Sequence, residues 1–494
     1  MTVNQKKVLF ISPCKTSAIG RDRDPVQKLR TNMSLPGVMI LGALEKAGCE
    51  TYFMDLTTED WGHQWMVGNH VLAYGLSSQD TVNRIEYLKP DFVIITSMFT
   101  FECMLVDELV QAIKRSFPDV CVILGGIHAS QRPEWHFEVS EPDFIVIGEG
   151  EETIVELVLA FDRCNFDPSM IPGIAFRDNT GKIVRTRVRH LLRQLNRPWA
   201  LNAVLLSLSG TPRYLEQQSR KAPAYVDDII GENIPAAALY GSRGCPRSCS
   251  YCSATRRTGR TIRHVGAIFL FRQFLKMRQE YGVGAFANQA DTFGLVPDDL
   301  DFLGMVKEYR QSSGDTSFVL NNPNAFFLEQ FFPKERNREI NLDFLELLRN
   351  AGINTITIAI ETLSQRFSGK VNWGEIRPEM VYELCRTIRA MGFKSDIYMM
   401  YGFPGQTEEE FAADLRFGVE LASLVDLITW SALSLFPGTR LYDKYVVRSG
   451  KENAYRRIIC EGYSAYYPRE EFNLSEVNGK RFSDSLSQFG QSWV

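Results

Sequence analysis

The sequence predicts an α/β protein with an N-terminal doubly wound parallel sheet and a following partial (β/α)6 barrel of the TIM-like kind. The length of 494 residues is enough for about two to four domains. Apolar residues make up 45% of the chain and charged residues 23%, as in ordinary globular proteins. Short apolar runs alternate with helical patterns in two separate series, which is typical of parallel sheets covered by helices.

The first series predicts an N-terminal domain over residues 1–161. Its strand candidates are short apolar runs rich in β-branched residues, as expected of parallel strands covered on both faces. Because helical patterns separate them, we expect a Rossmann-like sheet that binds ligands beyond the carboxyl ends of its strands. The strand candidates are 8–12, 51–54, 91–97, 120–124 and 144–148, and the helix candidates are 36–48, 106–117 and 152–161.

Residues 162–235 predict a connector, because proline and glycine pairs interrupt strand-like pieces at 173–177 and 182–187. We expect a small hairpin and an irregular connection there. Residues 446–494 show no regular pattern and are expected to be a C-terminal extension. Tyr463, Tyr466 and Tyr467 in this extension are candidates for a substrate pocket or for ordinary packing.

A second series predicts a barrel domain over residues 236–445. Its units are roughly 30 to 40 residues long, which fits βα repeats. Six units are fewer than the eight of a closed barrel, so we expect an open one. The strand candidates are 237–242, 284–288, 317–321, 355–360, 396–400 and 426–431, and the helix candidates are 264–281, 298–311, 341–350, 378–391 and 407–421.

Charge and composition exclude several classes of protein. Lys and Arg number 55 against 59 Asp and Glu, so the net charge of −4 gives no case for a nucleic-acid or membrane partner. The N-terminus lacks a secretory signal and no apolar run of about 18 residues occurs, which predicts a soluble cytoplasmic protein. Ten cysteines are too few for a disulfide scaffold of this length, so we expect buried residues or metal ligands.

Three cysteines stand together in the segment GCPRSCSYC, at Cys245, Cys249 and Cys252. Thiolates at this spacing can converge on one metal centre from a single loop. A closed zinc site normally needs four ligands, whereas three thiolates suit an iron–sulfur cluster with one open iron. The alternatives are three unrelated cysteines, or a zinc site completed by His264.

This Cx3CxxC pattern, with Tyr251 before its last cysteine and a series of βα units after it, resembles the radical S-adenosylmethionine (SAM) superfamily. The resemblance implies that Cys245, Cys249 and Cys252 hold a [4Fe–4S] cluster whose open iron binds SAM. Reduction by a one-electron donor such as flavodoxin or ferredoxin would then cleave SAM to a 5′-deoxyadenosyl radical. Tyr251 is expected near the adenine.

Four further places in the barrel carry the resemblance. Asp291 lies where the family has an acidic pair that contacts the methionyl part of SAM. Glu361 lies in a segment similar to the family's GIES pattern, near the ribose, although a solvated carboxylate is the alternative. Gly402 begins a turn similar to GFPGET, in which Gln406 replaces the glutamate, and residues 436–439 resemble a PGT turn.

The N-terminal domain resembles a cobalamin-binding domain. The first loop lacks GxGxxG, so a dinucleotide site is not supported. The resemblance implies that glycines make room for the nucleotide tail and that small hydroxyls bind its dimethylbenzimidazole or the corrin amides. His128 is expected to contact the tail, and a plain loop histidine or a cobalt ligand are the alternatives. The implied cobalamin contacts are Ser97, Thr100, Gly125, Gly126, His128, Gly148 and Glu149.

One motif of that domain is missing. The DxHxxG motif does not follow the first strand, and His63 does not match it, so we expect no histidine on the lower face of the cobalt. The alternative for the whole domain is a degenerate sheet that only docks the barrel.

Together these resemblances identify the chain as similar to cobalamin-dependent radical SAM enzymes. The implied reaction is methylation of an unactivated carbon, or of a phosphinate phosphorus, in a small biosynthetic intermediate bound between the two domains. One SAM would methylate cobalamin and a second would supply the radical that removes a substrate hydrogen.

Three other readings stay open at this point. Oxidative cyclases and ring-rearranging enzymes of this branch use the radical without methyl transfer. A methylthiotransferase would need a second iron–sulfur cluster, for which Cys14, Cys49 and Cys103 are the candidates. A cobalamin carrier or sensor would leave the three clustered cysteines without a purpose.

Overall fold

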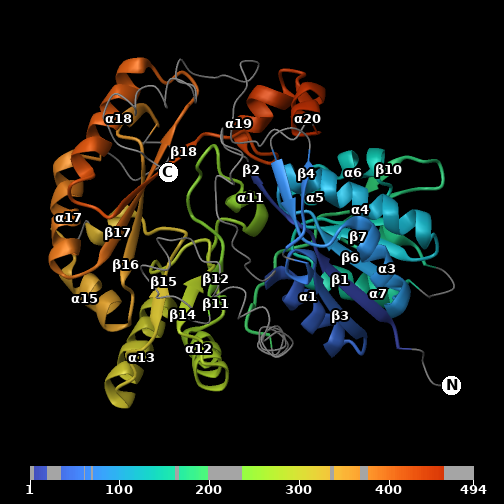
Figure 1. Cartoon of the computed structure of the whole chain (residues 1–494), viewed down its shortest axis with the longest axis horizontal. Helices are drawn as coiled ribbons and strands as arrows, with labels where there is room; N and C mark the ends of the chain where they lie inside the picture. Colours follow the sequence, from blue (N-terminus) through green and yellow to red (C-terminus); the bar gives the residue numbers. More distant parts are fainter. Residues whose placement is uncertain are drawn as a thin grey trace. The chain divides into compact units, whose positions relative to one another are not determined.

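The computed structural model describes residues 5–18, 35–60, 62–67, 71–161, 166–197, 236–333, 339–367 and 376–460 (Figure 1). The chain divides into two compact units. Unit 1 contains Met1–Pro223, Arg256–Thr258 and Lys451–Ser464, and unit 2 contains Ala224–Thr255, Gly259–Gly450 and Ala465–Val494. The three tyrosines of the predicted extension lie outside the described residues.

A seven-stranded sheet forms the centre of unit 1. Its five parallel strands lie in the order β3-β1-β6-β7-β8, and the antiparallel hairpin β9-β10 extends the β8 edge. This order confirms the doubly wound fold and places the topological switch point between β1 and β6. The strands are β1 (Lys7–Ser12), β3 (Glu50–Asp55), β6 (Phe92–Thr96), β7 (Cys121–Gly125), β8 (Phe144–Val146), β9 (Ile174–Arg177) and β10 (Ile183–Arg185).

The sheet is apolar on both faces because each face has its own core. Along β1, Val8 and Phe10 belong to one cluster, while Leu9 and Ile11 belong to the other. Helices α1 (Leu35–Lys46) and α7 (Glu151–Ala160) supply the first cluster, and α3 (Ser78–Leu88) and α4 (Cys103–Ser116) supply the second. Since successive strand residues point to opposite faces, a strand buried on both faces is a continuous apolar run.

A small antiparallel sheet accompanies the main sheet and was not expected from the sequence. It pairs β2 (Lys15–Ala18) and β4 (Gln64–Val67) with β5 (Val71–Tyr74).

The prediction that residues 446–494 lack regular structure is wrong for their first part. Helix α20 (Glu452–Cys460) belongs to unit 1 and contacts α6 (Pro133–Val139). The Arg456 guanidinium lies 5.6 Å from the Trp135 ring centroid, donates to the Trp135 carbonyl at 3.2 Å and pairs with Glu138. The amphipathic spacing of α20 is therefore used to pack on a segment more than 300 residues earlier in the chain.

Unit 2 is the predicted partial barrel. Two parallel three-stranded sheets, β11-β14-β15 and β16-β17-β18, follow chain order. Isolated parallel bridges from Leu320 to Ile353 and from Phe326 to Ile358 join them, so six parallel strands form one series. The strands are β11 (Ala236–Leu239), β14 (Ala285–Asn288), β15 (Val319–Asn321), β16 (Thr355–Glu361), β17 (Lys394–Tyr401) and β18 (Leu427–Ala432).

Helices between these strands complete the βα units. They are α12 (Ala267–Tyr281), α13 (Pro297–Ser313), α15 (Leu342–Asn350), α17 (Pro378–Ala390) and α18 (Glu408–Leu421). The first predicted strand, 237–242, is two elements: β11 ends at Leu239, and β12 (Ser242–Arg243) pairs antiparallel with β13 (Arg263–His264). No helix in the described part of the chain is long and apolar enough to cross a membrane.

Candidate functional site

The cysteine loop is closed at its base by the β12-β13 ladder. Gly244 begins the loop with a φ of +111°, and a Cβ there would lie 2.2 Å from the Thr261 carbonyl oxygen. Only glycine fits this position. Its N–H donates to Asp291 Oδ2 at 2.9 Å. Asp291, predicted to contact SAM, therefore fixes the start of the cysteine loop through this oxygen.

The three cysteines differ in exposure: Cys245 is buried, Cys249 is half-buried and Cys252 is exposed. Burial, then the neighbouring Cys252 and Cys245 thiols, raises the pKa of Cys249 to about 12. Burial also raises the pKa of Cys245. A cationic iron centre would remove this penalty on the thiolates, so the donor set fits an iron–sulfur cluster.

Residues between the cysteines are held by groups that come later in the chain. Arg247 pairs with Glu329, and its guanidinium lies 4.7 Å from the Phe327 ring centroid. Arg440, which follows β18, donates to the Ser248 carbonyl at 3.0 Å. These contacts anchor the loop through an arginine and through its backbone.

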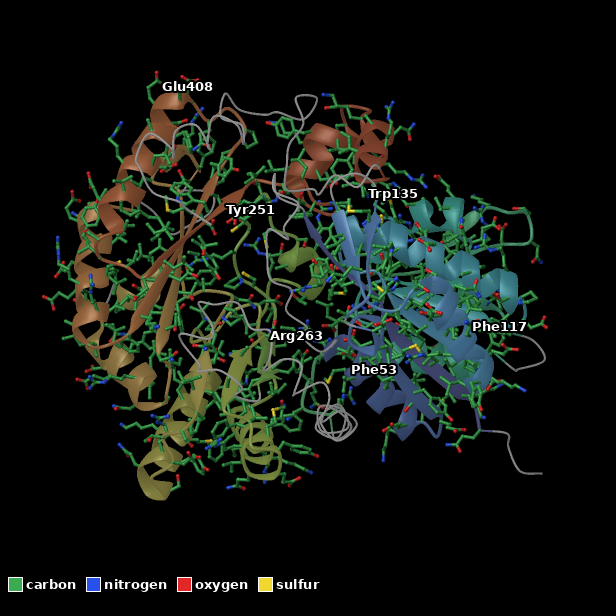
Figure 2. All side chains as sticks on the ribbon, viewed as in Figure 1. Phe53, Phe117, Trp135, Tyr251, Arg263 and Glu408 are labelled. Carbon is green, nitrogen blue, oxygen red and sulfur yellow. The ribbon has the colours of Figure 1, made fainter. Side chains whose placement is uncertain are left out.

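Tyr251, labelled in Figure 2, forms a half-buried polar pair with Glu361 at the end of β16. Its hydroxyl also lies beside the Cys249 thiol, and its ring is perpendicular to that of Phe403, with centroids 6.3 Å apart. Burial raises the pKa of Glu361 to about 7, although the Tyr251 hydrogen bond lowers it in part. Glu361 has a left-handed backbone with φ +67°, after a register shift that begins at Ala359. The structure thus brings three predicted site residues together: Cys249, Tyr251 and Glu361.

Gly402 begins a turn after β17 with a φ of +84°. Its N–H donates to Gln406 Oε1 at 2.8 Å. The nearest atom to a Cβ built on Gly402 is the Leu433 nitrogen at 4.0 Å, so this side of the turn is open. An open glycine at a strand end lets a ligand approach the backbone.

The zinc alternative does not hold, because both ring nitrogens of His264 are used elsewhere. Nε2 lies 3.1 Å from Asp299 Oδ1, and Nδ1 accepts from the Gly266 N–H at 2.9 Å. His264 thus connects β13 with Asp299 of α13. Neither of its ring nitrogens is left to coordinate a metal.

At the carboxyl edge of the unit 1 sheet, two glycines face open space. A Cβ built on Gly125 or on Gly148 meets no atom within 4 Å. Nearby, His128 is 1% exposed, yet its Nε2 has no hydrogen-bond partner, while Nδ1 lies 3.2 Å from Thr100 Oγ1. Burial, then the neighbouring His136, lowers the pKa of His128, so it is neutral. Open glycines beside an unsatisfied buried nitrogen fit a bulky polar ligand such as cobalamin.

Ser97, predicted to bind the nucleotide tail, is engaged within the protein. It is fully buried, and its Oγ lies 3.1 Å from Nε2 of His136. The other ring nitrogen of His136 lies 2.6 Å from Asp107 Oδ1, which also accepts from Ser140 Oγ at 2.5 Å. The Ser97 hydroxyl, the His136 ring and the Asp107 carboxylate therefore form one buried relay. Sequence patterns did not indicate His136 or Asp107, because they lie on separate helices.

Two other predicted cobalamin contacts have a role in the fold. Gly126 has a φ of +103°, and a Cβ there would lie 2.6 Å from the Ser97 carbonyl oxygen. Glu149 accepts from the Leu192 N–H at 2.7 Å and so fixes part of the predicted connector. The structure therefore explains both residues without a ligand.

A second cluster on the N-terminal cysteines is contradicted. Cys14 packs in the core on one face of the sheet and Cys49 in the core on the other face. The Cys14 thiol donates to the Leu76 carbonyl at 3.2 Å. Residues on opposite faces of a sheet cannot bind one cluster.

Comparison with known proteins agrees with both halves of this description. A family model described as the B12 binding domain matches residues 33–158, and the Radical SAM superfamily model matches residues 239–418. A cytidylyl-2-hydroxyethylphosphonate methyltransferase from Streptomyces wedmorensis is 25% identical over 491 residues, covering 93% of this chain and 86% of that protein. An anaerobic magnesium-protoporphyrin IX monomethyl ester cyclase from Cereibacter sphaeroides is 23% identical, covering 82% of this chain and 59% of that protein.

Among solved structures, the radical SAM methyltransferase TsrM from Kitasatospora setae has a similar fold, with a TM-score of 0.66. It is 18% identical, and the likeness covers 90% of this chain and 75% of that one. The B12-binding match spans the carboxyl edge of the unit 1 sheet, and the radical SAM match spans the cysteine loop. The chain belongs to the cobalamin-dependent radical SAM enzymes, whose cofactors are a [4Fe–4S] cluster, SAM and cobalamin.

Proposed function

We propose that this enzyme transfers a methyl group to an unactivated carbon, or to a phosphinate phosphorus, of a small biosynthetic intermediate. The observation that carries the proposal is the relationship to the phosphonate methyltransferase, which extends over 93% of this chain and 86% of that protein. The related cyclase supports ring formation as a second candidate, but the chain spans only 59% of that protein.

In this proposal Cys245, Cys249 and Cys252 supply the three thiolates for the cluster. Glu361 and Gly402 line the SAM site. A half-buried carboxyl group whose pKa is about 7 gains from hydroxyl donors, and a ribose offers two of them. Tyr251 now donates to Glu361, so it must share or release that carboxylate when a ribose binds.

On the sheet edge, Gly125 and Gly148 leave room for cobalamin, and His128 Nε2 provides a buried polar contact. Thr100 sets the orientation of the His128 ring through the bond to Nδ1. When bound, the cluster and SAM supply a carbon radical and cobalamin supplies the methyl group. An external one-electron donor, such as flavodoxin or ferredoxin, completes the system.

The test is anaerobic reconstitution of the full chain with iron, sulfide and cobalamin, followed by iron counting and visible spectra. The loaded enzyme is then reduced by the one-electron donor in the presence of methyl-deuterated SAM. The corrin fraction is analysed by mass spectrometry. Deuterated methyl on the corrin supports methyl transfer. SAM cleavage without such label supports the cyclase-type chemistry, and failure to retain corrin or to cleave SAM contradicts both.

The substrate class is tested with cytidylyl-2-hydroxyethylphosphonate, the compound in the name of the related methyltransferase. A product that gains one deuterated methyl group would place this chain with the phosphonate methyltransferases. A product that only loses hydrogen would place it with the oxidative enzymes.

A further inference from the structure

The carboxylate of Asp414 on α18 is a buried junction of three hydrogen bonds. The residue is fully buried. Oδ2 accepts from Thr362 Oγ1 at 2.7 Å and from Gln406 Nε2 at 3.3 Å, and Oδ1 accepts from the Leu363 N–H at 2.7 Å. Burial raises the pKa of Asp414 to about 6, while the Leu363 and Thr362 bonds lower it. A charge in this position depends on all of its donors.

Two of these bonds control the end of β16. Thr362 and Leu363 directly follow Glu361, whose φ of +67° is unfavourable for a residue that carries a Cβ. The Thr362 N–H also donates to the Ile360 carbonyl at 2.9 Å, which makes the bend tight. The carboxylate of Asp414 thus holds the two residues after the bend, and with them the direction of the Glu361 side chain.

The third bond controls the end of β17. Gln406 is fully buried, and its Oε1 accepts from the Gly402 N–H at 2.8 Å and from the Phe403 N–H at 3.2 Å. Because Oε1 faces two donors, Nε2 must face Asp414. The GFPGET turn of the family has a glutamate at the position of Gln406, which would place a second carboxyl group against Asp414.

These contacts form a closed circuit around Tyr251. Its hydroxyl bonds to Glu361, and its ring contacts Phe403. Asp414 connects the two partners, through Thr362 on one side and Gln406 on the other. We propose that Asp414 is a positioning residue that fixes Glu361 and the turn at Gly402 in the geometry that binds SAM. This inference rests on the proposed function, which assigns both residues to SAM.

Asp414→Asn tests the circuit. The new amide NH2 group would face the NH2 group of Gln406, which cannot turn without losing its bonds to Gly402 and Phe403. We expect the affinity of the reconstituted enzyme for SAM to fall about tenfold, with iron content unchanged.

Reversal of polarity provides the rescue. In Asp414→Asn combined with Gln406→Glu, the new carboxylate accepts from Gly402, from Phe403 and from the new asparagine amide. We expect SAM affinity to return to within about threefold of wild type, whereas Gln406→Glu alone lowers it by placing two carboxyl groups together. Thr362→Val is a milder variant, should Asp414→Asn fail to fold. It keeps the side-chain shape and removes the hydroxyl that donates to Asp414 and accepts from the Ser364 N–H.

Asp396→Asn is the matched control. Asp396 is a buried aspartate on β17 that accepts from Thr429 Oγ1 at 3.0 Å. The measurements are iron content, melting temperature, SAM binding, and the electron paramagnetic resonance of the reduced cluster with and without SAM. Weakened SAM binding in Asp414→Asn, with rescue in the double variant and none of this in Asp396→Asn, supports the proposal.

Wild-type SAM affinity in Asp414→Asn overturns the proposal, as does equal loss in Asp396→Asn or absence of rescue. A wild-type enzyme that holds iron but does not bind SAM would instead overturn the proposed function. The two failures are distinguishable. Comparison among the variants decides the role of Asp414, whereas SAM binding by the wild type decides the proposed function.

Discussion

The cysteine loop of unit 2 and the sheet edge of unit 1 are built differently, although a cofactor is assigned to each. The loop is anchored by its backbone and by Arg247, and its three thiols influence one another. At the sheet edge, the polar groups bond among themselves, as in the Ser97–His136–Asp107 chain. The first site presents ligating side chains, whereas the second presents space left by glycines. Residue type therefore indicates which loops form a site, but neighbours decide which side chains reach the ligand.

The largest expected effect concerns the loop. Cys245→Ala should lower bound iron to background, because the proposed site has three thiolates to hold the cluster. Iron and sulfide counting after anaerobic reconstitution checks this. Cys385→Ala, at a buried cysteine of α17, is the control and should keep its iron. Full iron content in Cys245→Ala would show that the cluster lies elsewhere.

The next effect tests space at the sheet edge. Gly125→Val should weaken cobalamin binding at least about tenfold while the apoprotein stays folded, because its Cβ enters open space. Gly126→Ala should instead destabilise the apoprotein, because its Cβ clashes with the Ser97 carbonyl. Cobalamin titration and melting curves separate the two. Unchanged cobalamin affinity in Gly125→Val would remove this edge from the cobalamin site.

A smaller effect tests whether the buried relay serves the fold or the ligand. His136→Phe removes the ring partner of Ser97 and leaves Asp107 with the Ser140 hydroxyl but no imidazole, and should cost about 3 kcal/mol in denaturation of the apoprotein. Ser97→Ala should cost about 1 kcal/mol and leave cobalamin affinity unchanged. If Ser97→Ala weakened cobalamin binding as strongly as Gly125→Val, its hydroxyl would belong to the ligand after all.

The last prediction concerns a pH dependence in unit 1. Burial raises the pKa of Asp55 from 3.8 to about 7, although Lys15 opposes this in part. The folded state then binds more protons than the unfolded state between these values, so stability falls as pH rises from about 4 to about 7. Asp55→Asn should flatten this fall in apoprotein melting temperature, and it keeps an acceptor for the Thr57 N–H. An unchanged slope would show that other carboxyl groups cause it.

Much of the fold could be predicted because buried positions are apolar and form recognisable runs in the sequence. Residues such as Val93 and Ile95 are fully buried on one face of the sheet, and Ile94 is buried on the other. In a strand covered on both faces, no polar residues interrupt the apolar run, so the run is easily recognised. In the small antiparallel sheet, β4 lacks this signal because exposed and half-buried residues alternate along it. Strand β5 is mostly buried, but it is only four residues long.

The site was predictable as motifs but not as contacts. The spacing of Cys245, Cys249 and Cys252 indicates a shared loop directly. By contrast, the contact between His136 and Ser97 joins residues 39 positions apart, which no local pattern encodes. The left-handed backbone of Glu361 is equally hidden, because distant Asp414 stabilises it.

The contact of α20 with α6 affects how the chain is made. Residues 452–460 leave the ribosome after every strand of the barrel, yet they complete the N-terminal unit. During translation Trp135 and Glu138 cannot contact Arg456 until more than 300 further residues have been added. The N-terminal unit, although synthesised first, is therefore among the last parts of the molecule to be finished.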